Sequence, residues 1–388
     1  MQSSKIEVIE NQQGQRLISR RSFNSLWALC LCAMIGLCSC ALSADRGTPP
    51  QNASSLPAQT STQQKPPVKK ATVDPNKFAL VVAGVGGEDA YTKKFTAQAT
   101  HLYEILTNQL GFSEKNVFLL TETVSGAGPE DGARESEVVP SKRATAEEVR
   151  KVFAAIKSAA NAESLVLVVL IGHGAVDNQV PKFNLVGPDL SAKDYSQLLG
   201  TLPNKKSIFV NCSSSSGDFV KPLSSQNRIV ITATRSGNEQ NATVFADHFI
   251  AAFTDNAADA DKNGRVSVLE AFNYATKLTA DWYKEKNRLA TEHALIDDNG
   301  DGTGHEEAGN GDGNLAKIIY LDSKTIEEAA GDAELERLIK ERQRLEEEVE
   351  KLKTRKSEMK PEEYEAELEK VLVDLAKVNQ QIKGKQKN

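Results

Sequence analysis

Five short runs of largely apolar residues, separated by segments with helical spacing, constrain the fold more than any other feature of this chain. The runs lie at residues 78–83, 117–120, 165–171, 207–210 and 228–233. Strands that are apolar along their whole length are buried on both faces, which is typical of a parallel sheet covered by helices. We therefore predict an α/β domain over residues 77–322, built on a mostly parallel sheet flanked by helices.

Helical spacing fills most of the connections between these runs. The predicted helices lie at residues 97–110, 145–156, 191–199, 243–253 and 268–283. Thr145 and Glu148 have the spacing of a capping box, which predicts where the second of these helices begins. Residues 122–143, by contrast, are polar, contain glycine and form a segment too long for an ordinary connection. This segment predicts a surface loop near a functional site.

The composition argues against one class of function. The chain has 388 residues, of which 39% are hydrophobic, and its formal net charge is −6. A chain of this length can bury a sizeable core in one or two domains. The acidic balance, without a basic stripe interleaved with aromatic residues, argues against a nucleic-acid partner.

The first 44 residues have the pattern of an export signal. An apolar stretch at residues 26–42 follows several arginines and contains four of the five cysteines, Cys30, Cys32, Cys38 and Cys40. A basic segment, an apolar core and small residues at its end are typical of a signal peptide. A retained membrane anchor is the alternative, because the stretch approaches the length that spans a bilayer.

Two motifs refine this prediction of export. Residues 19–23 resemble a twin-arginine motif, and residues 37–40 resemble a lipoprotein processing box in which Cys40 would become the lipidated first residue. The arginines could instead be the positive flank of an ordinary signal. Residues 45–76 are rich in Pro, Gln, Ser and Thr and predict a disordered tether. We expect a protein exported to a bacterial periplasm or cell envelope and held at the membrane by its signal or a lipid anchor.

A histidine and a cysteine follow two consecutive apolar runs. The run at residues 165–171 leads into His173, and the run at residues 207–210 is followed closely by Cys212. Ligands of parallel sheets bind at the carboxyl ends of the strands, so we expect both side chains at a functional edge. A thiol beside an imidazole is the arrangement of a cysteine nucleophile and its base. Cys212 is also the one cysteine outside the leader, and a free thiol in an oxidising compartment needs either burial or a use.

The segment from Leu170 to Gly174, together with the turn that contains Cys212, resembles the caspase-like cysteine peptidases. That group includes caspases, legumains, metacaspases and gingipains. The similarity covers roughly residues 78–253, and Ile231–Gly237 looks like the next strand and specificity loop of legumain-like members. The resemblance implies a caspase-haemoglobinase-like fold and an endopeptidase that cleaves protein or peptide substrates.

The resemblance also implies a role for each residue of the site. In these families the cysteine attacks the peptide carbonyl to form an acyl-enzyme, and the histidine protonates the leaving amine. Carried over, Cys212 would be the nucleophile and His173 the acid and base. The backbone N–H groups of Gly174 and Cys212 would then hold the oxyanion.

The turn after the fourth run departs from the family pattern, which usually reads acidic residue, small residue, cysteine, any residue, Ser, Gly. Counting from the end of the strand places Ser213 at the nucleophile's position, whereas aligning on Ser216 and Gly217 places Ser214 there. Only a short insertion makes Cys212 the nucleophile. Two hypotheses therefore stay open: an exported cysteine endopeptidase, and a catalytically inactive caspase-like fold that acts as an envelope binding or scaffold module.

Residues 259–270 fit the twelve-residue EF-hand loop, within an expected insert at residues 255–308. The expected ligands are Asp259, Asp261, Asn263, the carbonyl of Arg265, Ser267 directly or through a water, and the bidentate carboxylate of Glu270. Gly264 supplies the sharp turn at the sixth position. The pattern predicts a structural calcium site, and the alternative is an acidic helix-capping loop that binds no metal.

A second acidic segment, residues 297–304, begins like another loop of this kind. Ala308 occupies the position at which the bidentate acid would be expected. Three interpretations stay open: weak calcium binding, completion of a site by Glu306 or Glu307, and a simple turn without metal.

Residues 323–388 carry the spacing of a coiled coil. Apolar residues recur mostly at intervals of three and four from Leu335 to Met359 and again from Tyr364 to Ile382, with Pro361 between the two series. Such spacing predicts two helices that pack along a shared seam. We predict an antiparallel helical hairpin, which could also mediate self-association.

Overall fold

The structure is a computed structural model that describes residues 70–124 and 139–388, apart from residues 205, 310, 330, 357–358 and 386–388. The predicted export signal and most of the predicted tether lie outside these residues, as does the middle of the polar segment 122–143. Within the described residues, no helix is both long enough and apolar enough to cross a membrane.

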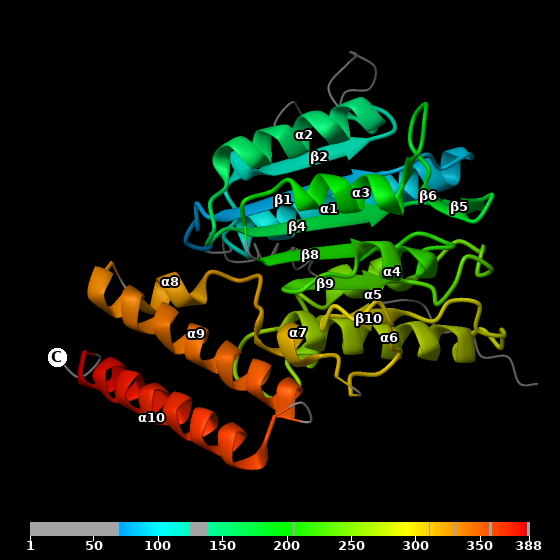
Figure 1. Ribbon diagram of the computed structural model, residues 1–388. Coiled ribbons are helices and arrows are strands. Elements are labelled where there is room, and N and C mark those ends of the chain that lie inside the picture. The colour runs from blue at the N-terminus through cyan, green and yellow to red at the C-terminus, as the bar shows by residue number, and fades with distance from the viewer. Residues whose placement is uncertain are drawn as a thin grey trace, which may run out of the picture. The chain divides into compact units, whose positions relative to one another are not determined.

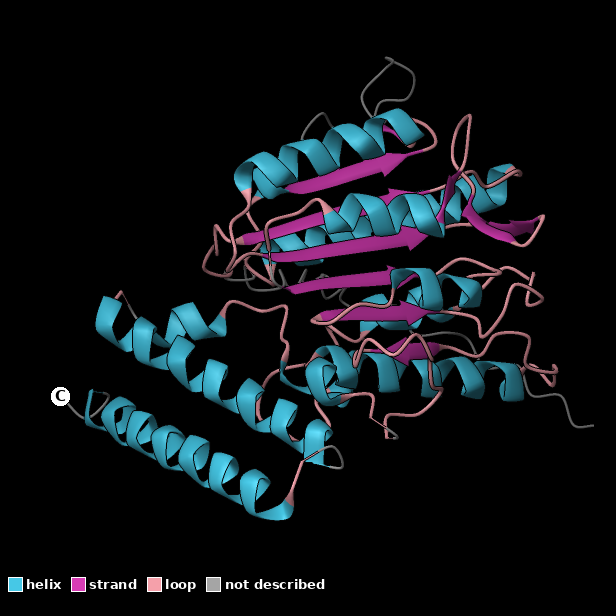
Figure 2. Cartoon of the chain, viewed as in Figure 1, coloured by secondary structure: helices cyan, strands magenta, loops and turns pink. Residues whose placement is uncertain are grey.

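A seven-stranded sheet forms the centre of the α/β region (Figures 1 and 2). Its strands are β1 (Lys77–Ala83), β2 (Val117–Thr121), β3 (Lys142–Arg143), β4 (Leu165–Ile171), β8 (Lys206–Asn211), β9 (Arg228–Thr232) and β10 (Leu295–Asp297). They lie in the order β10-β9-β8-β4-β1-β2-β3. Every neighbouring pair is parallel except β10 and β9, which are antiparallel. The predicted mostly parallel sheet is therefore confirmed.

Helices cover both faces of this sheet. One face packs against α1 (Asp89–Asn108), α5 (Phe245–Ala251) and α6 (Val268–Glu285). The other face packs against α2 (Ala146–Ala159), α3 (Ala192–Gly200) and the short α4 (Val220–Leu223). Residues of a central strand alternate between the two cores: Ile208 and Val210 face the first, and Phe209 faces the second. Burial on both sides explains why these strands are apolar throughout.

Local signals set several helix starts. The Thr145 hydroxyl accepts a hydrogen bond of 3.2 Å from the Glu148 backbone N–H, so the predicted cap begins α2. Helices α3 and α6 begin with complete capping boxes. Helix α1 begins at Asp89 rather than at residue 97, because its first two turns are largely polar and give no apolar spacing.

A small antiparallel sheet follows His173 directly and was not predicted. It consists of β5 (Gly174–Asp177), β6 (Val180–Phe183) and β7 (Leu190–Ser191). Asn178 and Gln179 connect the first two strands with φ of 49° and 65°. Two consecutive positive φ values are typical of the tight type I′ hairpin turn. Strands this short leave little periodicity in the sequence.

The carboxyl-terminal region is helical, as predicted. Residues 323–388 contain α8 (Lys324–Ala329), α9 (Ala333–Arg355) and α10 (Pro361–Lys385), and α7 (Asn314–Ile318), which was not predicted, precedes them. The start of α9 packs against the end of α10, through Leu338, Ile339 and Ile382, and its end packs against the start of α10. The two helices therefore run antiparallel (Figure 1). An ion pair between Lys206 of β8 and Glu347 joins α9 to the sheet.

Candidate functional site

His173 and Cys212 follow neighbouring strands at the same edge of the sheet, but at different depths. Strands β4 and β8 are parallel, with Leu170 opposite Asn211. Cys212 is therefore level with Ile171, the last residue of β4, and Ser214 is level with His173. Along β8, Cys212 therefore lies two residues before the position that is opposite His173.

The loop that follows β1 and helix α1 both contact the His173 ring. Its ring centroid lies 5.0 Å from those of Tyr91 and Phe95, and both contacts are edge-on. The pKa of His173 is lowered mainly by burial, while a hydrogen bond to the Gly86 backbone and the charge of Glu88 act in the opposite direction. The imidazole is therefore half-buried and favours its neutral form.

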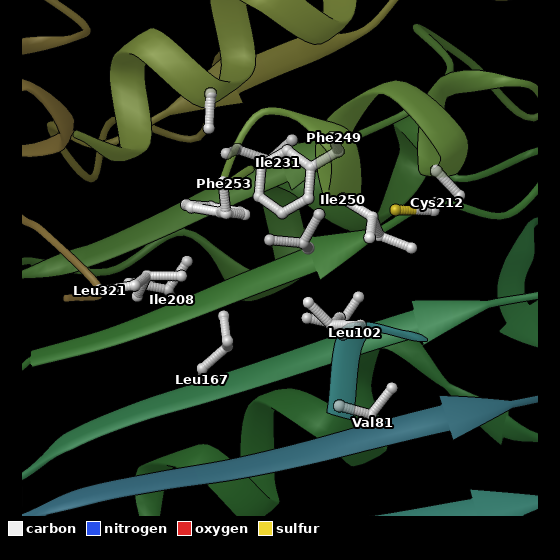
Figure 3. Close-up of a cluster of buried hydrophobic side chains, with 14 of the residues drawn as sticks. Val81, Leu102, Leu167, Ile208, Cys212, Ile231, Phe249, Ile250, Phe253 and Leu321 are labelled. Atoms are coloured by element: carbon white, nitrogen blue, oxygen red, sulfur yellow. The ribbon is translucent and has the colours of Figure 1, made fainter. Parts of the chain in front are cut away.

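The Cys212 side chain belongs to the hydrophobic core. It is 1% exposed and lies in the cluster that contains Phe249 and Ile250 of α5 (Figure 3). Among the described residues, no hydrogen bond connects its sulfur to the His173 ring. The structure thus places the two predicted catalytic residues on neighbouring strands without joining them.

The electrostatics around Cys212 oppose formation of a thiolate. Burial raises the pKa of the Cys212 thiol, and the negative charges of Glu292 and Asp247 raise it further. A cysteine nucleophile requires the reverse, since its pKa is normally lowered by a nearby cation or a helix amino terminus. The charges that act on this thiol are thus of the wrong sign for catalysis.

The two backbone groups expected to hold the oxyanion already have partners. The Cys212 N–H donates to the Leu170 carbonyl at 2.8 Å, which continues the β4–β8 ladder. The Gly174 N–H donates to the Ser214 hydroxyl at 3.3 Å. An oxyanion could bind there only if Ser214 moved away.

The serine turn is buried and bonded to itself and to its neighbours. Ser213 donates through both its N–H and its hydroxyl to the Asn211 side-chain oxygen, at 3.0 Å and 2.7 Å. Ser216 contacts the Thr234 hydroxyl at 3.1 Å. Ser213 to Ser216 are each at most 2% exposed. Ser213, the alternative nucleophile position from strand counting, therefore points into this network.

A polar cluster that sequence reasoning missed lies beside the serine turn. The Glu239 carboxylate is 2.5 Å from the His293 ring nitrogen and 3.3 Å from the Arg235 guanidinium. The Glu239 carbonyl also accepts the Ser215 N–H at 2.8 Å. Arg235 lies in the segment that resembles a specificity loop. No spacing in the sequence links Glu239 to His293, because 54 positions separate them.

Glu292 is a second missed residue, and it fixes helix α5. Its carboxylate accepts the N–H groups of Val244 and Phe245 at 2.9 to 3.3 Å, where α5 begins. The side chain is 4% exposed, and burial raises its pKa to about 7. Glu292 is therefore a buried acid whose charge acts on Cys212, and its carboxylate does not face solvent.

Three of the predicted ligands converge in the acidic loop at residues 259–270. Oxygens of Asp259, Asp261 and Glu270 all lie within 4.8 Å of one another. Gly264 has φ of 81°, as the sharp turn requires. The Asn263 side chain contacts Asp261, so its amide lies in the same loop. Convergent oxygen ligands of this kind fit a hard divalent cation.

The Arg265 side chain links this loop to the carboxyl-terminal region. Its guanidinium makes two hydrogen bonds to Asp322, of 2.8 Å and 3.0 Å. It also lies 3.9 Å from the centre of the Tyr320 ring. The side chain is thus committed to this contact, which leaves only the backbone carbonyl of Arg265 for the role predicted at the seventh position.

The second acidic segment repeats the hydrogen-bond pattern of the first. Asp312 accepts the N–H groups of Asp298 and Asn299, just as Glu270 accepts those of Ala260 and Asp261. Asp312, rather than Glu306 or Glu307, therefore holds the place in this hydrogen-bond pattern that Glu270 holds in the first loop, and the three interpretations of the segment stay open. The sequence concealed Asp312 because it lies fifteen positions after Asp297 instead of eleven.

A cavity of about 550 Å³ lies between this second segment and α9. Asp301, Glu347, Glu350 and Arg355 are among its lining residues. Neither His173 nor Cys212 contributes to its walls, so this cavity is separate from the predicted peptidase edge.

Comparisons with known proteins do not identify a family. No family model matches the sequence, and no curated protein matches it. Among solved structures, the chain is similar to protein GSU0716 from Geobacter sulfurreducens, with 12% identity and a TM-score of 0.37. The match covers 57% of this chain and 92% of the other. A similarity of this degree carries no information on the activity of this chain.

Proposed function

We propose that this protein is a catalytically inactive relative of the caspase-like peptidases that serves as a binding or scaffold module in a bacterial cell envelope. The caspase-like relationship is supported by the Leu170–Gly174 motif at the end of a buried strand and by the turn that follows the next strand. The envelope location is supported by the export pattern of residues 1–44.

The observation that carries this proposal is the burial of the Cys212 sulfur among apolar side chains. A thiol in that environment is held neutral and cannot reach a substrate carbonyl without moving part of α5. Apo structures of enzymes often show loose catalytic hydrogen bonds, so a long distance alone would not exclude catalysis. Here, however, the depth of the residue and the negative charges around it act together.

A serine nucleophile at this edge is supported no better. Ser214 is level with His173, but its hydroxyl lies 3.3 Å and 3.4 Å from the backbone N–H and carbonyl of Gly174. A serine needs a base within hydrogen-bond reach to become nucleophilic. The described contacts of the His173 ring are aromatic side chains and the Gly86 backbone, so the base is directed elsewhere.

The competing hypothesis is an exported cysteine endopeptidase, and one experiment separates the two. The full chain is incubated with acyloxymethyl-ketone probes and with a diverse peptide library, in calcium and reductant. We expect no label on Cys212 and no cleavage above that of the Cys212→Ala variant. Labelling or cleavage in the wild type that Cys212→Ala abolishes would establish the peptidase instead. Ser213→Ala and Ser214→Ala serve as matched variants for the two serine positions.

We further propose that the loop at residues 259–270 binds calcium as a structural cation. The convergence of Asp259, Asp261 and Glu270 supports a divalent cation, and the EF-hand spacing favours calcium. Isothermal titration with calcium tests this proposal, with an Asp259→Asn/Asp261→Asn variant as the control. Absence of binding to the wild type would leave the loop as a helix cap, because Ser267 and Glu270 form the capping box of α6.

A further inference from the structure

The outward face of α10 carries an apolar patch that the hairpin does not use. Leu372 and Val373 lie at the middle of the helix and are each 45% exposed, although most large hydrophobic side chains described are buried. With Leu368 and Ala376 they line a shallow hollow of about 380 Å³. The inward seam of the same helix, including Val371, packs against α9.

The residues of this face repeat at alternating intervals of three and four. The series is Glu362, Glu365, Glu369, Leu372, Ala376, Asn379 and Lys383. This spacing places all of them along one stripe of the helix, which is the pattern of a second coiled-coil seam. The stripe is acidic toward its amino end, apolar at its centre and basic toward its carboxyl end.

The acidic end of the stripe is not neutralised within the described chain. None of its three glutamates forms an ion pair with another described residue, whereas α9 carries pairs such as Arg344 with Glu341. Acidic side chains in the first turn are favourable beside the helix dipole, which accounts for Glu362. Glu365 and Glu369 lie beyond that turn and are exposed to solvent, so they add negative charge to this end of the stripe.

We propose that this face binds the same face of a second copy of this chain, with the two α10 helices antiparallel. A two-fold axis between Leu372 and Val373 brings the two apolar centres together. Glu362 then lies opposite Lys383 of the partner subunit, and the same contact recurs at the other end. Charge therefore selects the antiparallel arrangement, because a parallel pair would place each glutamate beside its own counterpart.

The size of the patch sets the strength of the dimer. One helix stripe of about seven turns is small beside the interfaces of obligate dimers. We expect a reversible dimer with a dissociation constant in the range of about 1–100 μM. Opposite charges at its two ends make the affinity fall as salt is added.

Sedimentation of the full chain over a concentration series tests the apolar centre. The wild type should pass from monomer to dimer, and Leu372→Glu/Val373→Glu should weaken the dimer by at least about tenfold. Leu289→Glu is the matched control, because Leu289 is 89% exposed and lies outside α10. It should dimerise as the wild type does. A wild type that stays monomeric, or an α10 variant that dimerises normally, would overturn the proposal.

Charge reversal tests the antiparallel arrangement and needs no change in the apolar centre. One variant is Glu362→Lys/Glu365→Lys, and the other is Asn379→Glu/Lys383→Glu. Each alone places like charges at both ends and should dimerise at least about tenfold more weakly. An equal mixture of the two should recover dimers, because no like charges then face each other and positions 362 and 383 carry opposite charges at both ends. Recovery supports the proposal, and a mixture that stays as weak as its components contradicts it.

Discussion

The sheet edge at His173 and the acidic loop at residues 259–270 both carry motifs of known sites, but their side chains are arranged differently. In the loop, carboxylate oxygens from three predicted ligands converge within 4.8 Å. At the edge, the predicted nucleophile is buried in the core and both predicted oxyanion donors are already bonded. Three acidic side chains of the loop therefore converge, whereas the catalytic groups predicted at the edge do not.

The difference teaches which kind of motif local spacing can specify. All predicted ligands of the loop lie within twelve residues, and the turn that Gly264 permits lets the three acidic ones converge. The edge combines residues from two strands, and its geometry depends on register and depth as well as on residue type. A shift of two residues along β8 keeps a side chain on the same face of the sheet but moves it away from the edge by two rises of about 3.3 Å each.

The largest expected effect tests whether Cys212 is a core residue. Cys212→Asp should lower the free energy of unfolding by about 3 kcal/mol or more, because it buries a carboxyl among apolar groups. Cys212→Ala should cost only about 1 kcal/mol. Asn238→Asp, an exposed change nearby, should have almost no effect. Urea unfolding measures all three, and a fully stable Cys212→Asp would place the side chain outside the core.

The second expected effect is a dependence of stability on pH through Glu292. Burial raises its pKa from the ordinary 4.5 to about 7, so the folded state keeps a proton that the unfolded chain releases. Stability should therefore fall by roughly 3 kcal/mol as pH rises from about 4.5 to 7, and level off above that.

A Glu292→Gln variant isolates this contribution. Asp298, whose pKa is raised to about 6 by burial, adds a change of the same sign in both proteins. The difference in unfolding free energy between wild type and variant should therefore vary with pH only through Glu292. If the difference in unfolding free energy were constant from acid to neutral pH, Glu292 would not be a buried acid with a raised pKa.

The third expected effect concerns the acidic loop at residues 259–270. Calcium at a hundred times its dissociation constant should stabilise the chain by about 2.7 kcal/mol. Thermal unfolding with and without calcium measures this gain, and Asp259→Asn/Asp261→Asn should abolish most of it. Asp301→Asn reports separately on the second acidic segment. An unchanged melting temperature at about 10 mM calcium would contradict a calcium site, because even weak extracellular sites fill at that concentration.

The smallest effect concerns Ser214. Ser214→Ala removes the acceptor of the Gly174 N–H and should cost about 1 kcal/mol. The titration of His173, followed by NMR, should not change, since its ring contacts lie on α1 and at Gly86. A His173 pKa that moves clearly in Ser214→Ala would show that the two side chains interact and would revive a hydrolytic site at this edge.

The sequence could predict the sheet and the loop because their signals are local. Apolar runs marked the five central parallel strands, and twelve consecutive residues marked the loop. The antiparallel β10 and the small sheet after His173 were missed because strands of two to four residues carry almost no periodicity. The coiled-coil hairpin was predicted from its spacing and the proline between its helices.

The site residues that the sequence did not indicate were missed for a different reason. Glu292 meets the start of α5 across 47 to 48 positions, and Glu239 meets His293 across 54. Asp312 accepts backbone N–H groups of the second acidic segment from an unexpected distance along the chain. Such partners are selected by folding and not by spacing, so no local pattern indicates them. The depth of Cys212 belongs to the same class, since only the pairing of β4 with β8 determines it.

The most direct test of the central claim is the alkylation rate of Cys212 in the native full chain, resolved by mass spectrometry from the leader cysteines. If the thiol is part of the core, its modification should be slow and should follow the unfolding transition as urea is added. His173→Ala should leave that rate unchanged. Rapid modification of the native protein that depends on His173 would contradict the account and identify an activated nucleophile.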